Sequence, residues 1–346
     1  MEMTGTHTRN EIASQPEAWA TALADLDAQA AAIDALFADG GYDSLLFTGC
    51  GSTYYLAIAA AAVAQELCAL PARGVPASEL WLDLSAAGRV GRKPLLVAVS
   101  RSGATTETIR ACEAWQAAGG DLLTLSCYPD QPLATMGRLN LVLASGQEQS
   151  IAQTRAFSTL YLAAVYAAAR WAGREDLLAA LRGLPAAGRR VHATALPLAQ
   201  ALGGDSGIDR IYVLGSGLRY GLACEVSLKL KEMSLSHSEP FHFLEFRHGP
   251  KSMVTPQALV IGLLSDANRA HEEAVLDEMR AQGGRILALA ERDADISFNS
   301  GLPESARAIL YLPPLQQLAF ERSLARGLDP DRPMHLDAVV RLDGKG

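Results

Sequence analysis

The sequence of 346 residues predicts an α/β protein with two tandem doubly wound parallel-sheet domains, each a flavodoxin-like αβα sandwich, related by internal duplication. Short apolar segments, typical of buried parallel strands, alternate with helical stretches along the chain. A pattern of strand, glycine turn and helix also occurs twice, at one constant offset. The matching residues are Gly49, Gly51, Tyr54 and Ala57 in the first half and Gly215, Gly217, Tyr220 and Ala223 in the second.

The first half begins with an expected helical arm. Residues 11–40 are rich in Ala and Leu, and Gly40 and Gly41 end the helical pattern. The expected strands that follow are 44–48, 73–76, 95–99, 122–126 and 139–143, and the expected helices are 56–67, 106–118 and 159–171. This alternation predicts a doubly wound parallel sheet.

The same alternation restarts after a glycine-rich segment. Helical residues 175–203 lead into a predicted linker at 203–207. The expected strands beyond it are 210–214, 258–263, 285–290 and 308–312, and the expected helices are 218–236, 271–281 and 315–326. The predicted domains are an N-terminal helical arm at 1–40, a first domain at 41–175, a second domain at 205–330 and a C-terminal tail at 331–346.

Composition and charge exclude several classes of function. With 49% hydrophobic residues the chain can bury sizeable cores. Its net charge of −8, without a dense Lys/Arg run, argues against nucleic acid or a membrane surface as a partner. The polar N-terminus lacks the apolar core of a secretion signal, and the longest apolar run, 160–169, is too short to span a bilayer. We therefore expect a cytoplasmic protein.

The cysteine and histidine patterns predict neither a disulfide framework nor a bound metal. The five cysteines are odd in number and scattered without CxxC spacing, which is typical of reduced thiols. The seven histidines form no ligand motif such as HExxH. We expect no metal and no cofactor.

The turn after the expected strand 95–99 is a candidate ligand site. Its hydroxyls belong to Ser100, Ser102, Thr105 and Thr106. They surround Gly103 and directly precede a helix whose first N–H groups lack partners within the helix. Hydroxyls and free amides match the oxygens of a phosphate, and Arg101 would add a charged contact. A ligand-free N-cap is the alternative, but it needs fewer hydroxyls, so we favour a phosphate site.

The two halves differ at this turn. The second half reads Leu264-Ser265-Asp266-Ala267 at the corresponding place, so we expect only the first half to hold phosphate.

The glycine turns themselves resemble part of a dinucleotide fingerprint, but Tyr54 and Tyr220 stand where a third glycine should allow close helix packing. We therefore do not favour a nucleotide site there. Ser52 and Thr53 follow the first strand and are expected to face the same crevice as the hydroxyl turn.

A second group of polar residues follows Gly217. Glu225, Lys229, Glu232 and Ser236 are spaced four, three and four residues apart and share one helix face. Such a face is usually a solvated stripe. The segments 237–242 and 245–250 add histidines and carboxylates next to it, and a carboxylate with an imidazole near a sugar phosphate could transfer protons.

On these motifs the chain resembles the sugar isomerase (SIS) domain family, most closely the isomerase half of glucosamine-6-phosphate synthase and stand-alone deaminase-like relatives. The resemblance runs nearly end to end. The resembling segments are Glu11 to Pro16, Cys50 to Tyr54, Ser100 to Thr105, Glu148 to Phe157, Leu228 to Glu232 and Phe246 to Pro250. It implies an enzyme that binds a sugar phosphate and forms a homodimer with a shared active site.

The resemblance also implies roles for individual residues. Those expected to bind the substrate are Ser52, Thr53, Ser100, Arg101, Ser102, Thr105, Ile151 and Gln153. Glu232 resembles the carboxylate that moves a proton between C1 and C2 of the sugar, and Lys229 the lysine one turn before it. His248 resembles the histidine that opens the ring, supplied across the dimer interface.

Two departures from the family pattern affect the expected function. The sequence contains no glutamine-hydrolysing segment with an N-terminal cysteine nucleophile, so we expect no use of glutamine by this chain. The tail 329–338 resembles the closing lid of the family, but Ala338 stands where the family has an imine-forming lysine, and alanine has no amine. Lys345 lies out of register with that position.

These observations lead to one main hypothesis and two alternatives. The main hypothesis is a phosphosugar aldose-ketose isomerase or deaminase of the glucosamine-6-phosphate to fructose-6-phosphate type. The first alternative is a non-catalytic phosphosugar-binding sensor, favoured by Ala338. The second is a fructosamine-phosphate deglycase, which would need room for an amino-acid substituent.

Overall fold

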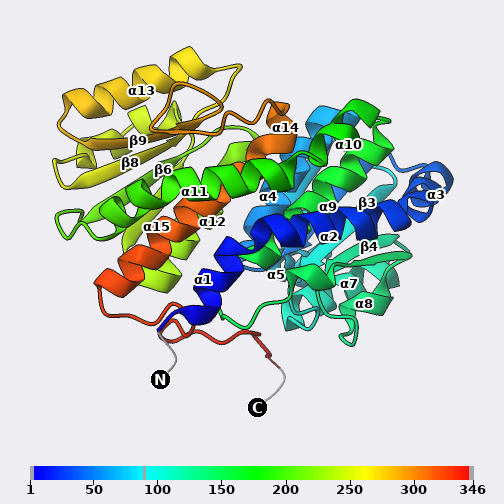
Figure 1. Ribbon diagram of the computed structural model, residues 1–346. Coiled ribbons are helices and arrows are strands. Elements are labelled where there is room, and N and C mark those ends of the chain that lie inside the picture. Colours follow the sequence, from blue (N-terminus) through cyan, green and yellow to red (C-terminus); the bar gives the residue numbers. More distant parts are fainter. Residues whose placement is uncertain (1–3, 89–90, 343–346) are drawn as a thin grey trace. The chain divides into compact units, whose positions relative to one another are not determined.

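The computed structural model describes residues 4–88 and 91–342 (Figure 1). In these residues ten strands form two five-stranded sheets, and the neighbouring strands in both sheets are parallel. The chain forms two compact units. The first unit comprises Glu17–Glu148, Arg155–Arg182 and Asp337–Gly346, and the second comprises Met1–Pro16, Gln149–Thr154 and Gly183–Leu336.

The first unit is built on a sheet with the strand order β2-β1-β3-β4-β5. Its strands are β1 (Ser44–Gly49), β2 (Ala72–Pro76), β3 (Pro94–Ser100), β4 (Leu122–Ser126) and β5 (Leu139–Val142). Its helices are α2 (Gln15–Ala28), α3 (Ala30–Gly40), α4 (Ser52–Cys68), α5 (Ala77–Leu82), α6 (Leu84–Ala87), α7 (Thr106–Ala117), α8 (Leu133–Met136), η1 (Ala144–Gly146), α9 (Arg155–Trp171) and α10 (Glu175–Leu181). β1 and β4 are buried along their whole length, as strands covered on both faces must be.

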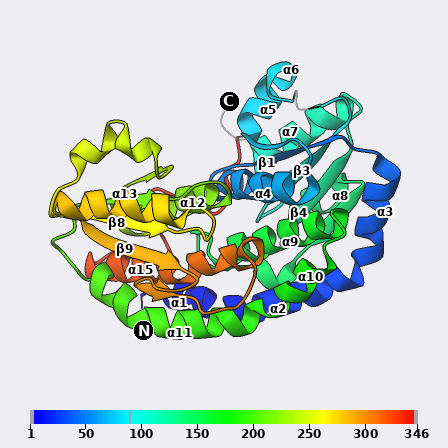
Figure 2. The same cartoon turned by 90° about the horizontal axis from the view of Figure 1, so that it is seen from above.

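The second unit is built on a sheet with the order β10-β9-β8-β6-β7. Its strands are β6 (Arg210–Leu214), β7 (His237–Phe241), β8 (Ala258–Leu263), β9 (Arg285–Ala290) and β10 (Ile296–Ser297). Its helices are α1 (Thr6–Ala13), α11 (Leu184–Gly203), α12 (Leu218–Ser234), η2 (Glu245–Arg247), η3 (Pro250–Met253), α13 (Arg269–Ala281), α14 (Glu304–Arg307), η4 (Ala308–Tyr311) and α15 (Leu312–Ala325). Figure 2 shows α13 and α11 on opposite sides of β8 and β9.

The two sheets have the same topology. Each places its first strand between its second and third, which is the flavodoxin-like order 2-1-3-4-5. Each first strand also ends at a glycine that the following helix approaches closely: a Cβ at Gly49 would lie 2.6 Å from Thr53 Oγ1, and one at Gly215 would lie 2.4 Å from the carbonyl oxygen of Arg219. The duplication predicted from the glycine turns is therefore confirmed in the fold.

One expected strand was wrong, and one strand was not expected. Residues 308–312 form η4 and the start of α15 rather than a strand. β7 was not expected, because its sequence contains His237, Glu239 and Pro240. It pairs with β6 and occupies the edge of the sheet, where proline and polar residues are tolerated. The helical arm consists of three helices, of which α1 belongs to the second unit.

The other expected strands were found within one or two residues of their predicted bounds. The domain boundaries 1–40, 41–175, 205–330 and 331–346 stay a prediction. Lys345 lies outside the described residues. Among the helices of residues 4–88 and 91–342, none combines the length and hydropathy needed to cross a bilayer.

Candidate functional site

The hydroxyl turn connects β3 to α7 in the first unit. Ser100 Oγ accepts a hydrogen bond from the N–H of Gly103 at 3.1 Å, and Ser102 Oγ accepts one from the N–H of Ala104 at 3.2 Å. The hydroxyl oxygens of Ser100 and Thr105 lie 3.3 Å apart. Gly103 adopts a φ of +68°, a conformation that favours glycine. The predicted phosphate ligands Ser100, Ser102 and Thr105 therefore surround one tight turn.

Ser52 and Thr53 begin α4, directly after the neighbouring strand β1. Thr53 Oγ1 accepts a hydrogen bond from the N–H of Cys50 and donates one to its carbonyl, both at 2.9 Å. Since β1 and β3 are adjacent and parallel, their carboxyl ends meet at the same sheet edge. The structure therefore brings the Ser52–Thr53 turn and the hydroxyl turn to one edge, as expected from the sequence. Burial raises the pKa of the Cys50 thiol to about 11, which keeps this cysteine neutral and poorly nucleophilic at neutral pH.

Arg101 forms a buried ion pair next to the turn. Its guanidinium lies 3.3 Å from Glu148 Oε2, and the side chain of Glu148 is fully buried. The other carboxylate oxygen of Glu148 accepts the N–H of Ala156 at the start of α9. Glu148 was expected only as the first residue of a covering segment, and the pairing with Arg101 has no signal in the local sequence.

The C-terminal tail contacts donors of the same turn. Arg101 Nη2 donates to the carbonyl oxygen of Ala338 at 3.0 Å, and the N–H of Thr106 donates to that of Val340 at 3.3 Å. The N–H of Leu342 in turn donates to Thr106 Oγ1 at 3.1 Å. Two donors that could bind a phosphate, the Arg101 guanidinium and the N–H of Thr106, are thus bound to carbonyl oxygens of the tail. The residue bound to Arg101 is Ala338, which stands where the family has a lysine.

Ile151 and Gln153 belong to a short segment of the second unit, Gln149–Thr154. The carboxylate of Glu11 holds the start of this segment by accepting the N–H of Gln149 at 2.6 Å, and Ile151 N–H donates to the carbonyl of Asp331. In the described part of the chain Gln153 Oε1 is buried without a hydrogen-bond partner. The Glu11 motif and the covering segment, which are far apart in the sequence, are thus joined by these hydrogen bonds.

α12 of the second unit presents the candidate proton-transfer residues. Lys229 is buried, and its ammonium lies 3.4 Å from Glu225 Oε1 and is also bonded to the carboxylate of Glu232. Glu225 is fully buried, whereas the Glu232 side chain is 20% exposed. The structure thus brings Lys229 and Glu232 together, on a buried face rather than a solvated stripe. Glu225 was noted for its spacing without a role, and it supplies the second carboxylate that compensates the buried charge.

His248 lies in a separate loop between β7 and β8. Phe246 anchors this loop in the core, and Arg247 pairs with Glu278 of α13 at 2.6 Å. The His248 side chain itself is exposed. No hydrogen bond or ion pair joins it to the Glu232 carboxylate within the residues that the structure describes. Sequence reasoning placed the two residues in one catalytic group, and within one chain they are held by different elements.

The turn after β8 is the counterpart of the hydroxyl turn, and its backbone donors are already bound to carboxylates. The N–H of Ser265 donates to Glu272 Oε2 at 2.6 Å, and the N–H of Asp266 donates to Glu304 Oε2 at 3.3 Å. Glu304 also pairs with the buried Arg219. Carboxylates of the protein thus accept these backbone N–H groups in the second unit. That only the first half holds phosphate stays a prediction.

In residues 4–88 and 91–342, no group of three or more His, Cys, Asp or Glu side chains is arranged to hold a metal ion. The candidate groups described above are hydroxyls, amides and one arginine in the first unit, and the carboxylates and lysine of α12 in the second unit.

Comparison with known proteins assigns the chain to a family. The model of the SIS domain matches residues 42–170 and 206–314, one match for each sheet. The chain belongs to the SIS domain family. The two matched segments of this SIS protein contain the hydroxyl turn and α12, respectively.

The relatives of this SIS protein include longer enzymes. Glutamine–fructose-6-phosphate aminotransferase (isomerizing) of Bordetella parapertussis is 30% identical over 97% of this chain, which spans 58% of that relative. A solved structure named glucosamine-6-phosphate deaminase, from Thermotoga maritima, is 25% identical with a TM-score of 0.84, covering 97% of this chain and 99% of that one. Tagatose-6-phosphate ketose/aldose isomerase from Escherichia coli shares the fold, with a TM-score of 0.83, 23% identity and coverage of 94% and 95%.

Proposed function

We propose that this SIS protein is a sugar-phosphate isomerase or deaminase that converts a hexose or amino-hexose 6-phosphate, of the glucosamine-6-phosphate to fructose-6-phosphate type. The observation that carries the proposal is the contrast between the two equivalent turns. In the turn after β3 the N–H groups of Gly103 and Ala104 are bound to hydroxyls, and the carboxylate beside it, Glu148, is paired with Arg101. In the turn after β8 the backbone N–H groups themselves are bound to the carboxylates of Glu272 and Glu304. A phosphate in the first unit would therefore meet hydroxyls and an arginine at a turn whose backbone, among the described residues, no carboxylate occupies.

In this proposal the substrate is held by its phosphate and its hydroxyls. The phosphate ligands are Thr53, Ser100, Arg101, Ser102 and Thr105. Ser52, Ile151 and Gln153 contact the sugar, and the buried, unpartnered Oε1 of Gln153 in the described structure supports a ligand contact there. Binding energy from the phosphate then positions the reacting carbons.

The chemistry needs two proton transfers and one water. In the open-chain amino sugar the Glu232 carboxylate takes the proton from C2 and returns it to C1, while a second proton passes through solvent from the C2 amine nitrogen to O1. The C1 aldehyde and C2 amine thus become a C1 alcohol and a C2 imine. Water then replaces the imine by a carbonyl and ammonia leaves. Lys229 pairs with the Glu232 carboxylate and holds it in position for this step.

His248 is proposed to open the sugar ring. Because it is exposed in a loop and, among the described residues, forms no hydrogen bond or ion pair with Glu232, the proposal includes a homodimer in which His248 of one chain serves the site of the other. Cytoplasmic location is part of the same proposal.

A product assay tests the proposed function. Incubation of the protein with glucosamine 6-phosphate is expected to release equimolar fructose 6-phosphate and ammonia, measured by two independent coupled assays. Glucosamine without phosphate is the control and should remain unchanged. Absence of any product from amino-hexose and hexose 6-phosphates would contradict the proposal.

A second candidate function is a phosphosugar-binding sensor without catalysis. It is favoured by Ala338, which supplies no amine and whose carbonyl is bound to Arg101. The sensor predicts that fructose 6-phosphate stabilises the protein against heat while no product forms under any condition. A fructosamine-phosphate deglycase would instead release an amino acid from the corresponding phosphorylated conjugate.

A further inference from the structure

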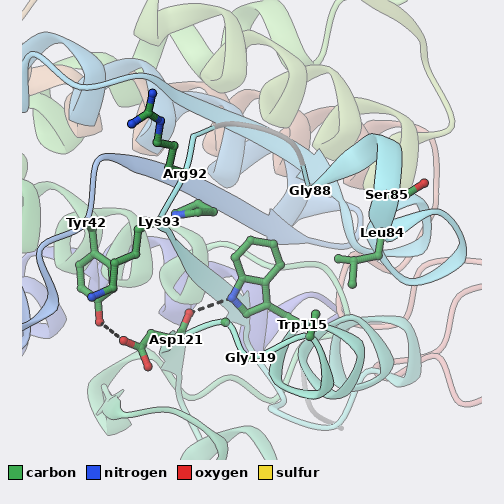
Figure 3. A pocket seen from close by; sticks show the side chains of 12 residues that line it. Tyr42, Leu84, Ser85, Gly88, Arg92, Lys93, Trp115, Gly119 and Asp121 are labelled. Carbon is green, nitrogen blue, oxygen red and sulfur yellow. Dashed lines mark hydrogen bonds between the residues drawn. The ribbon is translucent and has the colours of Figure 1, made fainter.

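Among the described residues, a cavity of about 380 Å³ in the first unit offers no aromatic face to a ligand (Figure 3). Tyr42, Lys93 and Asp121 line it and precede β1, β3 and β4, so the cavity lies at the amino edge of the sheet. Its aromatic residues, Tyr42 and Trp115, are only 7% and 6% exposed. The residues expected to contact a substrate belong instead to the hydroxyl turn and to the segment Gln149–Thr154.

The motif from Glu11 to Pro16 has no part in the proposed reaction. It joins the end of α1 to the start of α2, and its side chains Glu11 and Gln15 are 4% and 0% exposed. Burial of a carboxylate or a carboxamide is costly unless hydrogen bonds satisfy its polar atoms. The contacts of these two side chains therefore show what the motif holds in place.

Glu11 holds the start of the segment Gln149–Thr154. Its Oε1 accepts the N–H of Gln149 at 2.6 Å and the N–H of Ser150 at 3.3 Å, and its other oxygen accepts the Ser150 hydroxyl. Hydrogen bonds to a carboxylate are stronger than those to a neutral oxygen. One side chain thus fixes two consecutive residues of the segment.

Gln15 holds the end of the same segment through Gln316 of α15. Gln15 Nε2 donates to Gln316 Oε1 at 2.9 Å and to the carbonyl oxygen of Ile12 at 3.0 Å. Gln316 Nε2 in turn donates to the carbonyl oxygen of Thr154 at 3.2 Å. Gln316 and Thr154 are fully buried, so water cannot readily replace these bonds.

Asp331 joins α1 to the middle of the segment. Its carboxylate accepts the N–H groups of His7 and Thr8, at 3.1 and 2.7 Å, in the first turn of α1, where N–H groups lack partners within the helix. Its carbonyl oxygen accepts the N–H of Ile151 at 3.2 Å. The segment is thus attached at its start, middle and end, and all these attachments lie within the second unit.

We propose that Glu11 and Gln15 are positioning residues, which hold the segment Gln149–Thr154 in the conformation that presents Ile151 and Gln153 to the sugar. This role rests on the proposed function, in which the segment contacts the sugar and the hydroxyl turn binds the phosphate. Both residues act through the segment rather than by contact with the substrate. A segment held in its binding conformation loses less entropy when the sugar binds, so these residues raise affinity for the sugar and not for phosphate alone.

Calorimetric titration of the full chain with fructose 6-phosphate and with inorganic phosphate separates this role from a general loss of structure. Glu11→Gln keeps the size of the side chain but turns an acceptor oxygen into a donor, so it should weaken fructose 6-phosphate about five- to tenfold. Inorganic phosphate should bind with unchanged affinity. Glu17→Gln replaces an exposed carboxylate on α2 and should leave both affinities unchanged.

Further variants test the individual contacts. Ser150→Ala removes one donor to Glu11, and Glu11→Gln/Ser150→Ala should weaken fructose 6-phosphate no more than Glu11→Gln alone, because both changes break the same contact. Gln15→Met keeps the length of the side chain without its donors and should also weaken fructose 6-phosphate selectively. Thermal melts verify folding, and hydrogen exchange of the peptide that contains residues 149–154 should become faster in Glu11→Gln.

The two ligands also distinguish a failure of this role from a failure of the proposed function. Equal affinity of the parent and Glu11→Gln for fructose 6-phosphate would overturn the positioning role, even where hydrogen exchange becomes faster. Parallel loss of affinity for both ligands would show that Glu11 supports the fold only, and would overturn it too. A parent that binds inorganic phosphate but neither fructose 6-phosphate nor glucosamine 6-phosphate would contradict the proposed function itself, and this role with it.

Discussion

Lys229 shows how one residue organises the buried polar face of α12. A lysine ammonium out of water is costly unless opposite charges surround it, and here Glu225 and Glu232 lie on the same helix face, four residues before and three after. The spacing predicted that these side chains share a face, but not that the face is buried. Burial depends on the sheet and α15 packing against α12, which the local sequence does not encode.

Glu232→Gln tests the proposed proton transfer at the residue scale. Glutamine retains the size and polarity of the side chain but cannot accept a proton from carbon, so turnover of glucosamine 6-phosphate should fall about 100-fold or more. Sugar-phosphate binding, measured calorimetrically, should persist. Glu239→Gln is the matched control, because Glu239 is an exposed carboxylate paired with His237, and its turnover should equal that of the parent. Unchanged turnover in Glu232→Gln would remove this carboxylate from the mechanism.

At the scale of elements, the two equivalent turns show how a duplicated fold diverges. After β3 the amides of Gly103 and Ala104 bind the hydroxyls of Ser100 and Ser102, and after β8 the amides bind Glu272 and Glu304. The sequence revealed that the segment 264–267 has one hydroxyl residue, Ser265, where the hydroxyl turn has several. It could not reveal the replacement carboxylates, because Glu304 comes from a helix far along the chain.

Substitution of Glu272 tests this replacement. Glu272→Ala leaves the buried N–H of Ser265 without its acceptor and should cost about 1–3 kcal/mol of unfolding free energy. Glu272→Gln keeps an oxygen for that N–H and should cost less. Urea unfolding at constant pH measures both. A smaller loss in the alanine variant than in the glutamine variant would contradict the assigned contact.

The same pair of variants predicts a pH dependence. Burial raises the pKa of Glu272 above its usual value of 4.5, so the folded state binds its proton more tightly than the unfolded state. The resulting stability is fully present below pH 4.5 and is lost as pH rises through the folded pKa. Between pH 4.5 and 7 the parent should therefore lose stability relative to Glu272→Gln. A constant difference across this range would show that the carboxyl does not titrate abnormally.

The tail is a second element with a testable effect. Ala338 and Val340 bind Arg101 and the N–H of Thr106, so deletion of residues 337–346 should free both donors and tighten binding of inorganic phosphate about three- to tenfold. Deletion of 341–346 alone retains both carbonyls and is the matched control. Isothermal titration compares the three chains, and weaker binding after the longer deletion would show that the tail assists the anion.

The elements that sequence analysis missed share a physical cause. The apolar run 308–312 is too short for its period to distinguish a buried helix from a strand, and Pro313 and Pro314 fit the first turn of α15. β10 has two residues, too few to be recognised. The hydroxyl turn was predictable because its residues are contiguous.

At the scale of the whole molecule, the two units are not consecutive stretches of the chain. α1 and Gln149–Thr154 belong to the second unit, although the sequence around them forms the first, and residues from Asp337 onward return to the first unit. Neither unit can therefore be completed by one half of the chain alone. Trp19, buried and hydrogen-bonded to Ser158 at 2.8 Å, joins the N-terminal segment to α9 within the first unit.

These chain crossings predict that the protein unfolds as one cooperative system and that a ligand of the hydroxyl turn stabilises all of it. Differential scanning calorimetry should show one transition that fructose 6-phosphate moves upward, with a gain of about 2.7 kcal/mol at a ligand concentration about 100 times Kd. Fructose without phosphate is the control, and the Ser100→Ala/Ser102→Ala variant should lose most of the shift. Two separate transitions, with only one moved by the ligand, would show that the units unfold independently. An equal shift with fructose would show that the phosphate does not provide the binding energy.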